Sequence, residues 1–196
     1  MPEYSPSHGV VILAAGASGR LGRPKQLLAH RGETLVRRAA RFALETEPHT
    51  TIIVLGADAD AVFASVADLA LRRVECSDWR QGMGASLRAG LAALPARVAG
   101  ALIVLCDQPA LDSAHLHALR AAWRENPYRA AASAYAGRLG APALLPRLWF
   151  ADVSSTNGDH GARALLAKRS DQVVAVSNEA LGDDVDDDED LHLIET

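Results

Sequence analysis

Short apolar runs alternate with longer Ala- and Leu-rich stretches along most of the chain. Three of the runs are continuously apolar and are bounded by polar residues or glycine: residues 10–13, 52–55 and 101–105. Such runs are typical of strands that are buried on both faces, as in a parallel sheet. The pattern predicts weaker strands at three further places: residues 73–76, 130–134 and 173–176.

Helices are predicted between these strands. Residues 34–47 and 86–94 have helical patterning. A third helix is expected after Asp112 and Ser113, either of which can cap its first turn. Strands that alternate with helices predict βαβ units and a doubly wound, mostly parallel α/β sheet flanked by helices. Ligands of such sheets bind beyond the carboxyl ends of the strands, so functional residues are expected there.

The composition is that of an ordinary globular protein. The 196 residues are 49% hydrophobic and 22% charged, and this length is ample for a hydrophobic core. No run approaches the roughly 20 apolar residues needed to cross a bilayer, and the N-terminus lacks the basic start of a signal peptide. Cys76 and Cys106 are too few for a disulfide framework and lack metal-ligand spacing. These features predict a cytoplasmic protein that does not associate with membranes.

The net charge of −4 conceals an uneven distribution of charged residues. Seven of the eight residues 183–190 are acidic, which leaves 17 acidic against 20 basic side chains in the rest of the chain. A mildly basic body suits an anionic small-molecule ligand. It is too weak and too little clustered to indicate a nucleic-acid partner.

A glycine-rich loop with three cations follows the first predicted strand. Residues 14–25 contain three glycines and three basic side chains: Gly16, Gly19, Gly22, Arg20, Arg23 and Lys25. Backbone N–H groups of such a loop can surround phosphates, because glycine allows close approach and positive φ. Arg20 and Lys25 would then neutralise phosphate charge. The spacing matches neither Walker A nor GxGxxG, so composition alone leaves a plain turn with solvated cations as an alternative.

The order of residues in this loop is more specific than its composition. The string Ala14-Ala15-Gly16-x-Ser18-x-Arg20-x-Gly22-x-x-Lys25 closely resembles the signature loop of the nucleotidyltransferases related to MobA. The following Gln26-Leu27-Leu28 makes it most similar to the molybdenum cofactor cytidylyltransferases, the MocA-like branch.

This resemblance implies a Rossmann-like fold of the nucleotide-diphospho-sugar transferase type, with the loop wrapped around the triphosphate of a nucleotide. The matching Arg20 and Lys25 would stabilise the transferring phosphate and the pyrophosphate. The implied nucleotide contacts in and beside the loop are Leu13, Ala14, Ala15, Gly16, Ser18, Gly19, Arg20 and Lys25. The family resemblance also favours CTP, because the cytidylyl branch tends to carry Ala-Ala-Gly and the guanylyl branch Ala-Gly-Gly.

A single aspartate follows the apolar run 101–105, in the sequence Cys106-Asp107-Gln108-Pro109. Mg²⁺ favours one or two carboxylates plus phosphate oxygens, although a lone aspartate here can equally be a turn or cap residue. Asp-Gln-Pro resembles the metal motif of the same family, which implies that Asp107 binds Mg²⁺ or Mn²⁺ and takes part in catalysis. Cys106 is interpreted as a small buried packing residue.

Residues 79–91 contain Gly82-Met83-Gly84-Ala85-Ser86-Leu87 ahead of a predicted helix. The segment resembles the family's Gly-Met-Gly-x-Ser-Leu element, which implies that Gly82 and Ser86 contact the nucleobase. From the residues alone Ser86 can equally cap the helix, and the two roles can coexist.

Two later segments resemble the acceptor side of the family, residues 140–143 and 158–163. The resemblance implies that four residues line the pocket of the second substrate: Gly140, Pro142, Gly161 and Arg163. Arg163 would pair with the phosphate of an incoming pterin, and an arginine that faces solvent at a helix end is the alternative.

The acidic segment 184–191 is, on charge alone, a solvated run. It resembles the family's closing sequence Asp-Ile-Asp-Thr-Pro-Glu-Asp-Leu, which implies that Asp186 completes the metal site with Asp107. Asp187 and Asp188 replace the usual Thr-Pro, which removes the turn that a proline would make rigid and adds negative charge near a triphosphate.

These matches run in order from Val11 to Leu191. They imply one domain, residues 1–196, with a short tail 1–8, a nucleotide-binding half 9–110 and an acceptor-binding half 111–196. The implied reaction is transfer of CMP from CTP to the terminal phosphate of molybdenum-molybdopterin, with release of pyrophosphate. That phosphate is already ionised at neutral pH, so no general base is needed.

Three alternatives remain open at this point. The first is the same chemistry with GTP, and the second is transfer to a sugar phosphate or another phosphate acceptor. The third belongs to a different class, a non-catalytic carrier that delivers the pterin cofactor to a molybdenum hydroxylase. Intact loop cations and Asp107 argue against a protein that only carries the cofactor.

Overall fold

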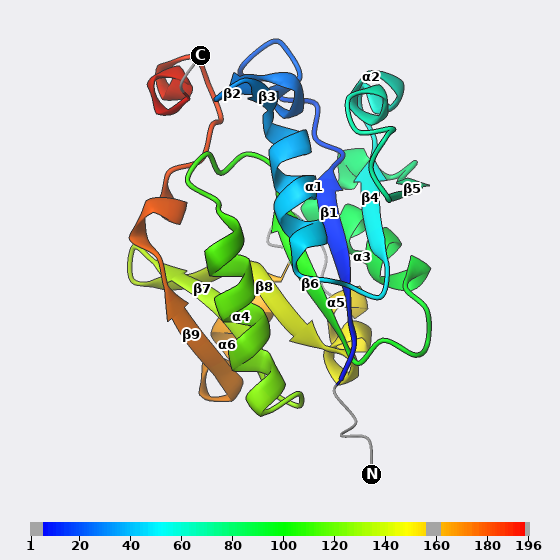
Figure 1. Cartoon of the computed structure of the whole chain (residues 1–196), viewed down its shortest axis with the longest axis vertical. Coiled ribbons are helices and arrows are strands. Elements are labelled where there is room, and N and C mark those ends of the chain that lie inside the picture. Colours follow the sequence, from blue (N-terminus) through cyan, green and yellow to red (C-terminus); the bar gives the residue numbers. More distant parts are fainter. Residues whose placement is uncertain (1–5, 156–161, 195–196) are drawn as a thin grey trace.

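A computed structural model describes residues 6–155 and 162–194 and has a seven-stranded sheet at its centre (Figure 1). The strand order is β5-β4-β1-β6-β8-β7-β9. The strands are β1 (His8–Ala14), β4 (Thr51–Leu55), β5 (Arg72–Glu75), β6 (Gly100–Leu105), β7 (Ala130–Tyr135), β8 (Arg138–Pro146) and β9 (Val173–Ser177). A separate hairpin pairs β2 (Ala29–His30) with β3 (Glu33–Thr34). In the large sheet, β8 is antiparallel to β6 and β7, and the other neighbours are parallel.

The predicted doubly wound, mostly parallel sheet is confirmed, and so are all six predicted strands. Strand β8 was not predicted from the sequence. This strand contains Gly140, Pro142 and Pro146, and proline cannot donate to a ladder while glycine has no side chain to pack. Its pairing with β7 is irregular between Ala132 and Ser133. A broken ladder with these residues does not have the alternation by which a strand is recognised in a sequence.

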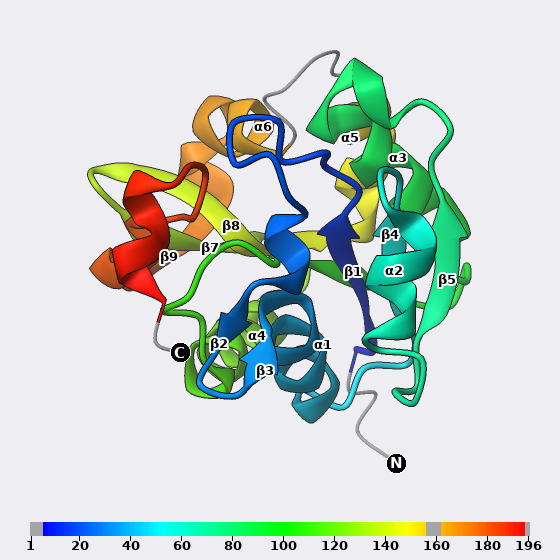
Figure 2. The same ribbon diagram turned by 90° about the horizontal axis from the view of Figure 1, so that it is seen from above.

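Helices cover both faces of the sheet, with α1 and α4 on one face and α3, α5 and α6 on the other (Figure 2). The α-helices are α1 (Leu35–Glu45), α2 (Ala59–Ala64), α3 (Met83–Ala93), α4 (Ser113–Glu125), α5 (Phe150–Ser155) and α6 (Arg163–Lys168). Short 3-10 turns complete the structure: η1 (Lys25–Leu27), η2 (Trp79–Gln81), η3 (Arg147–Trp149), η4 (Ser170–Gln172), η5 (Glu179–Gly182) and η6 (Glu189–Leu193). No helix among the described residues is long and apolar enough to cross a membrane.

The continuous apolar runs follow from this layered arrangement. Val10 and Ile12 of β1 pack into the cluster under α1 and α4, while Val11 and Leu13 pack into the cluster under α3. Both faces of the strand are therefore dry, and each side chain gains burial whichever way it points.

The helix starts are set by local capping. Thr34 accepts a hydrogen bond from the backbone N–H of Arg37 at the start of α1, and Asp112 accepts one from His115 at the start of α4. Helix α3 begins at Met83, with Gly82 at its N-cap in a left-handed backbone conformation (φ 100°). Of the two roles left open for Ser86, capping this helix is excluded, because Ser86 lies one turn inside it.

The chain leaves the adjacent parallel strands β1 and β6 in opposite directions. From β1 it passes through α1 to β4, toward the edge of the sheet formed by β5. From β6 it passes through α4 to β7, toward the opposite edge formed by β9. A crevice forms outside the carboxyl ends of strands at such a switch point. The fold therefore brings the loop after β1 and the residues after β6 to one place.

Candidate functional site

The loop after β1 is held closed by its own side chains. Ser18 Oγ accepts a hydrogen bond from the backbone N–H of Lys25 (3.0 Å). The buried Gln26 donates through Nε2 to the carbonyls of Ala14 (3.2 Å) and Gly16 (2.7 Å). Positive φ occurs at Ser18 (51°), and also at Gly22. The loop is thus fixed from inside before any ligand binds.

Lys25 lies between two carboxylates at the centre of the crevice. Its Nζ is 2.6 Å from Asp107 Oδ2 and 2.8 Å from Asp186 Oδ1. The other oxygen of Asp186 accepts from the Arg20 guanidinium at 2.8 Å. The side chains of Lys25 and Asp107 are only 16% and 13% exposed, so this charged cluster is largely withdrawn from solvent. It joins the loop after β1, the end of β6 and the C-terminal segment.

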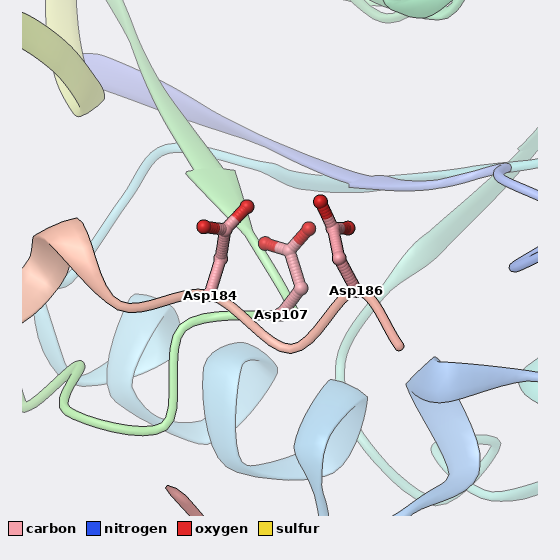
Figure 3. A group of neighbouring side chains, drawn as sticks. All are labelled: Asp107, Asp184 and Asp186. Carbon is pink, nitrogen blue, oxygen red and sulfur yellow. The ribbon is translucent and has the colours of Figure 1, made fainter. Parts of the chain in front are cut away.

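The C-terminal segment docks on the end of β6 through its backbone. The N–H of the fully buried Val185 donates to the carbonyl of Asp107 (2.8 Å). With Val185 directed into the core, Asp184 and Asp186 on either side of it present their carboxylates beside that of Asp107 (Figure 3). Asp190 Oδ2 accepts from the backbone N–H groups of Asp186 (2.8 Å) and Asp187. The Asp190 carboxylate therefore stabilises the turn at Asp187 and Asp188, the two residues that replace the family's usual Thr-Pro.

Asp107, Asp184 and Asp186 form a trio whose carboxylate oxygens lie within 4.8 Å of one another. Asp107 and Asp186 were predicted from the sequence, whereas Asp184 was not. The available signal was the alternation of Asp184, Val185 and Asp186, because residues two apart on an extended segment face the same side.

The donor set of this trio fits a hard divalent cation. Asp107 Oδ1 is buried without a hydrogen-bond partner among the described residues. The Asp184 carboxylate makes no ion pair within the described part of the chain. Carboxylate oxygens are the ligands that Mg²⁺ and Mn²⁺ prefer. The trio thus has unused oxygens of the right kind for either ion.

The charges in the cluster shift one another's protonation. Burial opposes the charge on Lys25, but Asp107 and Asp186 outweigh it and raise the pKa of Lys25 above its ordinary range. Burial would raise the pKa of Asp186, whereas Lys25 and Arg20 lower it overall. Partial burial and the two neighbouring carboxylates raise the pKa of Asp184. At neutral pH the cluster holds a charged lysine and an ionised Asp186.

Cys106 directly precedes Asp107 but is not a nucleophile in this arrangement. Complete burial and the negative charge of Asp107 raise the pKa of its thiol to about 12. Its Sγ contacts the carbonyl of Leu13 at 3.4 Å. The thiol stays neutral and packs against β1, as the sequence analysis expected.

An open cleft lies on the loop side of the trio. Seven of the ten predicted nucleotide-binding residues line it: Leu13, Ala15, Gly16, Arg20, Lys25, Gly82 and Ser86. Ser86 is 4% exposed, and its hydroxyl makes no hydrogen bond within the described chain. Three predicted residues do not line the cleft, namely Ala14, which is buried, Ser18, which closes the loop, and Gly19, which faces solvent. Trp79, Arg80 and Met83, which were not predicted, line it as well.

A second cavity lies on the other side of the trio and contains about 790 Å³ of empty space open to solvent. Of the predicted acceptor residues, Gly140 and Arg163 line it. Pro142 does not; it is buried in β8, where its carbonyl accepts from Ser133 Oγ (2.7 Å). Gly161 lies outside the described residues. Asp184 lines this cavity, whereas Asp107 and Asp186 line the cleft, so the trio stands between the two spaces.

Gln108, the middle residue of the Asp-Gln-Pro motif, ties together the walls of the second cavity. Its Nε2 donates to the carbonyls of Ala141 (3.2 Å) and Leu181 (2.8 Å). Because both partners are carbonyl oxygens, which can only accept, the amide nitrogen of Gln108 and not its oxygen must point toward them. This side chain links the end of β6 to β8 and to the C-terminal segment.

Comparison with known proteins agrees with this geometry. Residues 10–173 match the model of the MobA-like NTP transferase domain. The chain belongs to this family. Its fold and family are those of a nucleotidyltransferase, and the resemblance noted in the sequence is confirmed.

Two curated relatives align along nearly the whole length of the chain. Nicotine blue oxidoreductase of Paenarthrobacter nicotinovorans is 40% identical over 94% of both chains. Purine catabolism protein PucB of Bacillus subtilis is 30% identical, again over 94% of each.

One solved structure, Rv0371c from Mycobacterium tuberculosis H37Rv, superimposes with a TM-score of 0.83 at 29% identity and covers 96% of this chain and 97% of that one. A structure of Rv0371c in complex with manganese gives a TM-score of 0.78 at 28% identity, covering 98% and 100% of the two chains.

Proposed function

We propose that this nucleotidyltransferase transfers CMP from CTP to the terminal phosphate of molybdenum-molybdopterin and releases pyrophosphate. The observation that carries the proposal is the position of the aspartate trio, between a cleft lined by the glycine-rich loop and an adjoining cavity. Two substrates bound on either side would meet at these carboxylates. The choice of CTP rests on the resemblance of Ala14-Ala15-Gly16 to the cytidylyl branch.

The cleft supplies the nucleotide contacts in this proposal. The backbone around Gly16 would receive the triphosphate, with Arg20 and Lys25 offsetting the charge of the pyrophosphate that leaves. Lys25 is paired with Asp107 and Asp186 in this structure. Triphosphate binding would draw its ammonium group away from these carboxylates and toward phosphate oxygens. Gly82 and the unpartnered hydroxyl of Ser86 would contact the nucleobase.

Asp107, Asp184 and Asp186 would hold Mg²⁺ or Mn²⁺, which when bound neutralises phosphate charge and favours attack at the α-phosphorus. The acceptor phosphate is the nucleophile and is ionised at neutral pH. No side chain is needed to remove a proton, and the neutral Cys106 thiol has no step to perform. Catalysis by the chain then consists of positioning and charge stabilisation.

The lining of the second cavity favours a flat acceptor over a sugar. Its walls are largely apolar and include Leu87, Ile103, Leu105 and Leu181. Such walls suit the two apolar faces of a heteroaromatic ring, which a sugar does not present. We assign nucleotide binding mainly to residues 9–110 and acceptor binding mainly to residues 111–196. The division is not strict: Leu87, Ile103 and Leu105 of the first half also line the acceptor cavity, and Asp184 and Asp186 of the second half lie beside Asp107.

A second candidate function comes from the relative named nicotine blue oxidoreductase. A protein that reduces a dye needs a site for an electron donor and a flat dye, and the apolar cavity suits the latter. Hydride transfer has no use for the paired cluster of Lys25, Asp107 and Asp186, which is built for phosphate charge and a divalent cation. That cluster is the reason we favour nucleotidyl transfer.

The deciding experiment incubates the purified protein with Mg²⁺, molybdenum-molybdopterin and each of CTP, GTP, ATP and UTP. We expect pyrophosphate and a pterin dinucleotide with CTP alone, and neither product from an Asp107→Asn variant. A product with GTP alone would place the protein in guanylyl transfer, and a product from a sugar phosphate would change the acceptor. Dinucleotide binding without synthesis would instead favour a carrier for a molybdenum hydroxylase. Reduction of nicotine blue by NADH or NADPH without any nucleoside triphosphate would favour the oxidoreductase.

A further inference from the structure

Trp79 and Arg80 line the cleft beside the glycine-rich loop, and neither was predicted from the sequence as a site residue. Of the three tryptophans in the chain, Trp123 and Trp149 are fully buried, whereas Trp79 is only half-buried and reaches the cleft. A large aromatic ring that remains partly in water leaves apolar surface that a ligand can cover.

The Trp79 side chain is held in place by the backbone beneath it. A Cβ atom at Gly56, the residue after β4, would lie 2.6 Å from Trp79 Cγ and 2.7 Å from the carbonyl oxygen of Ala15. Only glycine leaves room for the indole at this position. The backbone N–H of Gly82 donates to the carbonyl of Trp79 (3.1 Å) and closes the short turn η2 ahead of α3. Three elements therefore set the position of the ring: the end of β4, the loop after β1 and the turn before α3.

The Arg80 guanidinium lies over the Trp79 ring, 4.3 Å from its centre. Arg80 is exposed and forms no ion pair within residues 6–155 and 162–194. Arg20 and Lys25, the other cations that line the cleft, both pair with Asp186. The aromatic ring, and not a carboxylate, thus holds Arg80 at the cleft.

We propose that Trp79 and Arg80 form the stacking surface for the nucleobase, with the Arg80 guanidinium between the indole and the base. The inference rests on the proposed function, because it takes the cleft to hold a nucleoside triphosphate with its base near Gly82 and Ser86. Arg80 precedes Gly82 by two residues and lines the same cleft. A planar guanidinium stacks on indole and on nucleobases alike. Because every base has such a face, the stack contributes affinity and leaves the choice between bases to other contacts.

The surroundings of Arg80 favour the base over the triphosphate as its partner. The cations assigned to the phosphates lie at the trio, where Arg20 and Lys25 each contact Asp186 at 2.8 Å. Arg80 pairs with none of the three carboxylates within the described chain and is stacked on a ring instead. Lysine keeps the charge of arginine but has no planar group to stack. An Arg80→Lys variant therefore separates stacking on a base from attraction to phosphate.

Calorimetric titrations of the full chain, with Mg²⁺ and without an acceptor, test the stack without nucleotidyl transfer. They compare CTP with inorganic tripolyphosphate, which has the phosphates and no base. Arg80→Lys should weaken CTP binding about tenfold, as loss of one base stack does, and change tripolyphosphate binding by less than about twofold. Arg20→Met should weaken both ligands, because its guanidinium is assigned to the phosphates.

Arg41→Lys is the matched control. Arg41 is also exposed and lies 4.5 Å from the centre of the Phe42 ring, but it lines neither the cleft nor the acceptor cavity. This variant should bind both ligands as the unmodified protein does.

Equal losses of CTP and tripolyphosphate in Arg80→Lys would overturn the inference, because Arg80 would then contact phosphate. Unchanged CTP affinity in Arg80→Lys would overturn it as well, and so would the same loss in Arg41→Lys. If the unmodified protein binds another nucleoside triphosphate in place of CTP, that nucleotide takes its place in the comparison and the same outcomes apply. A selective loss in a protein that makes no pterin dinucleotide would support the stack while removing the proposed function. Binding of no nucleoside triphosphate at all would overturn both.

Discussion

Replacing Lys25 by methionine removes the one ammonium group that Asp107 and Asp186 share, while keeping a side chain of similar length. Two unit charges about 5 Å apart repel by about 3 kcal/mol at an effective dielectric constant of 20. Breaking a buried ion pair by removing one partner costs about 3–5 kcal/mol, and the partial exposure of Asp186 (34%) favours the lower end. We therefore expect Lys25→Met to lose about 3 kcal/mol of stability in the absence of divalent cations, which for a chain of this size lowers Tm by roughly 6–12 °C.

Thermal unfolding with and without Mn²⁺ measures this effect. A divalent cation that binds the trio of Lys25→Met does not have to displace an ammonium group, so the same Mn²⁺ concentration should raise Tm more in the variant than in the unmodified protein. Arg20→Met is the control: its guanidinium also pairs with Asp186 but is 68% exposed, and its loss should cost less than about 1 kcal/mol. An unchanged Tm in Lys25→Met, or equal Mn²⁺ shifts in the two proteins, would refute the reasoning.

Three further predictions concern the metal site, the cavity and the dependence of stability on pH. Asp107→Asn should reduce pyrophosphate release by about a hundredfold or more while circular dichroism stays unchanged, and full activity would remove Asp107 from the site. In Gly140→Ala the new methyl group would collide with the hydroxyl of the buried Tyr135, so we expect a loss of about 1–3 kcal/mol and a raised KM for the acceptor but not for CTP. Burial, with the nearby basic residues, lowers the pKa of His8 from 6.5 to about 4. As pH falls, His8 therefore binds a proton in the unfolded chain before it does so in the folded chain, and stability falls by up to about 3 kcal/mol as pH drops from 6.5 to 4. His8→Gln should lose this part of the pH dependence, which urea titrations at several pH values would measure.

Elements with a strong local signal were predictable from the sequence. The apolar run 10–13 became the core of β1, because a continuous apolar segment gains burial on both faces of a sheet. Asp112 caps α4 as expected, since capping depends on residues three positions apart. Lys25 and Asp107 were identified because each follows a strand whose end is visible in the sequence.

Elements that depend on a partner elsewhere in the chain were missed. Strand β8 is held by β6 and β7, and its glycine and prolines hide it from a local pattern. Asp184 belongs to the trio because the neighbouring Val185 donates a hydrogen bond to the carbonyl of Asp107. Val185 and Asp107 are 78 positions apart by their numbers. Ser86 resembled a helix cap because the sequence does not show that α3 starts at Met83.

The sequence by itself determined the alternation of strands and helices, the glycine-rich loop and the family, because these depend on neighbouring residues and on motifs that are contiguous in the chain. Tertiary structure alone decided that Lys25 lies 2.6 Å from Asp107, and that Arg138 and Arg163 line one cavity. Those pairs are 82 and 25 positions apart by their numbers. Their distances follow from the order of strands in the sheet and the packing of helices on it, which bring together charges that no local pattern relates.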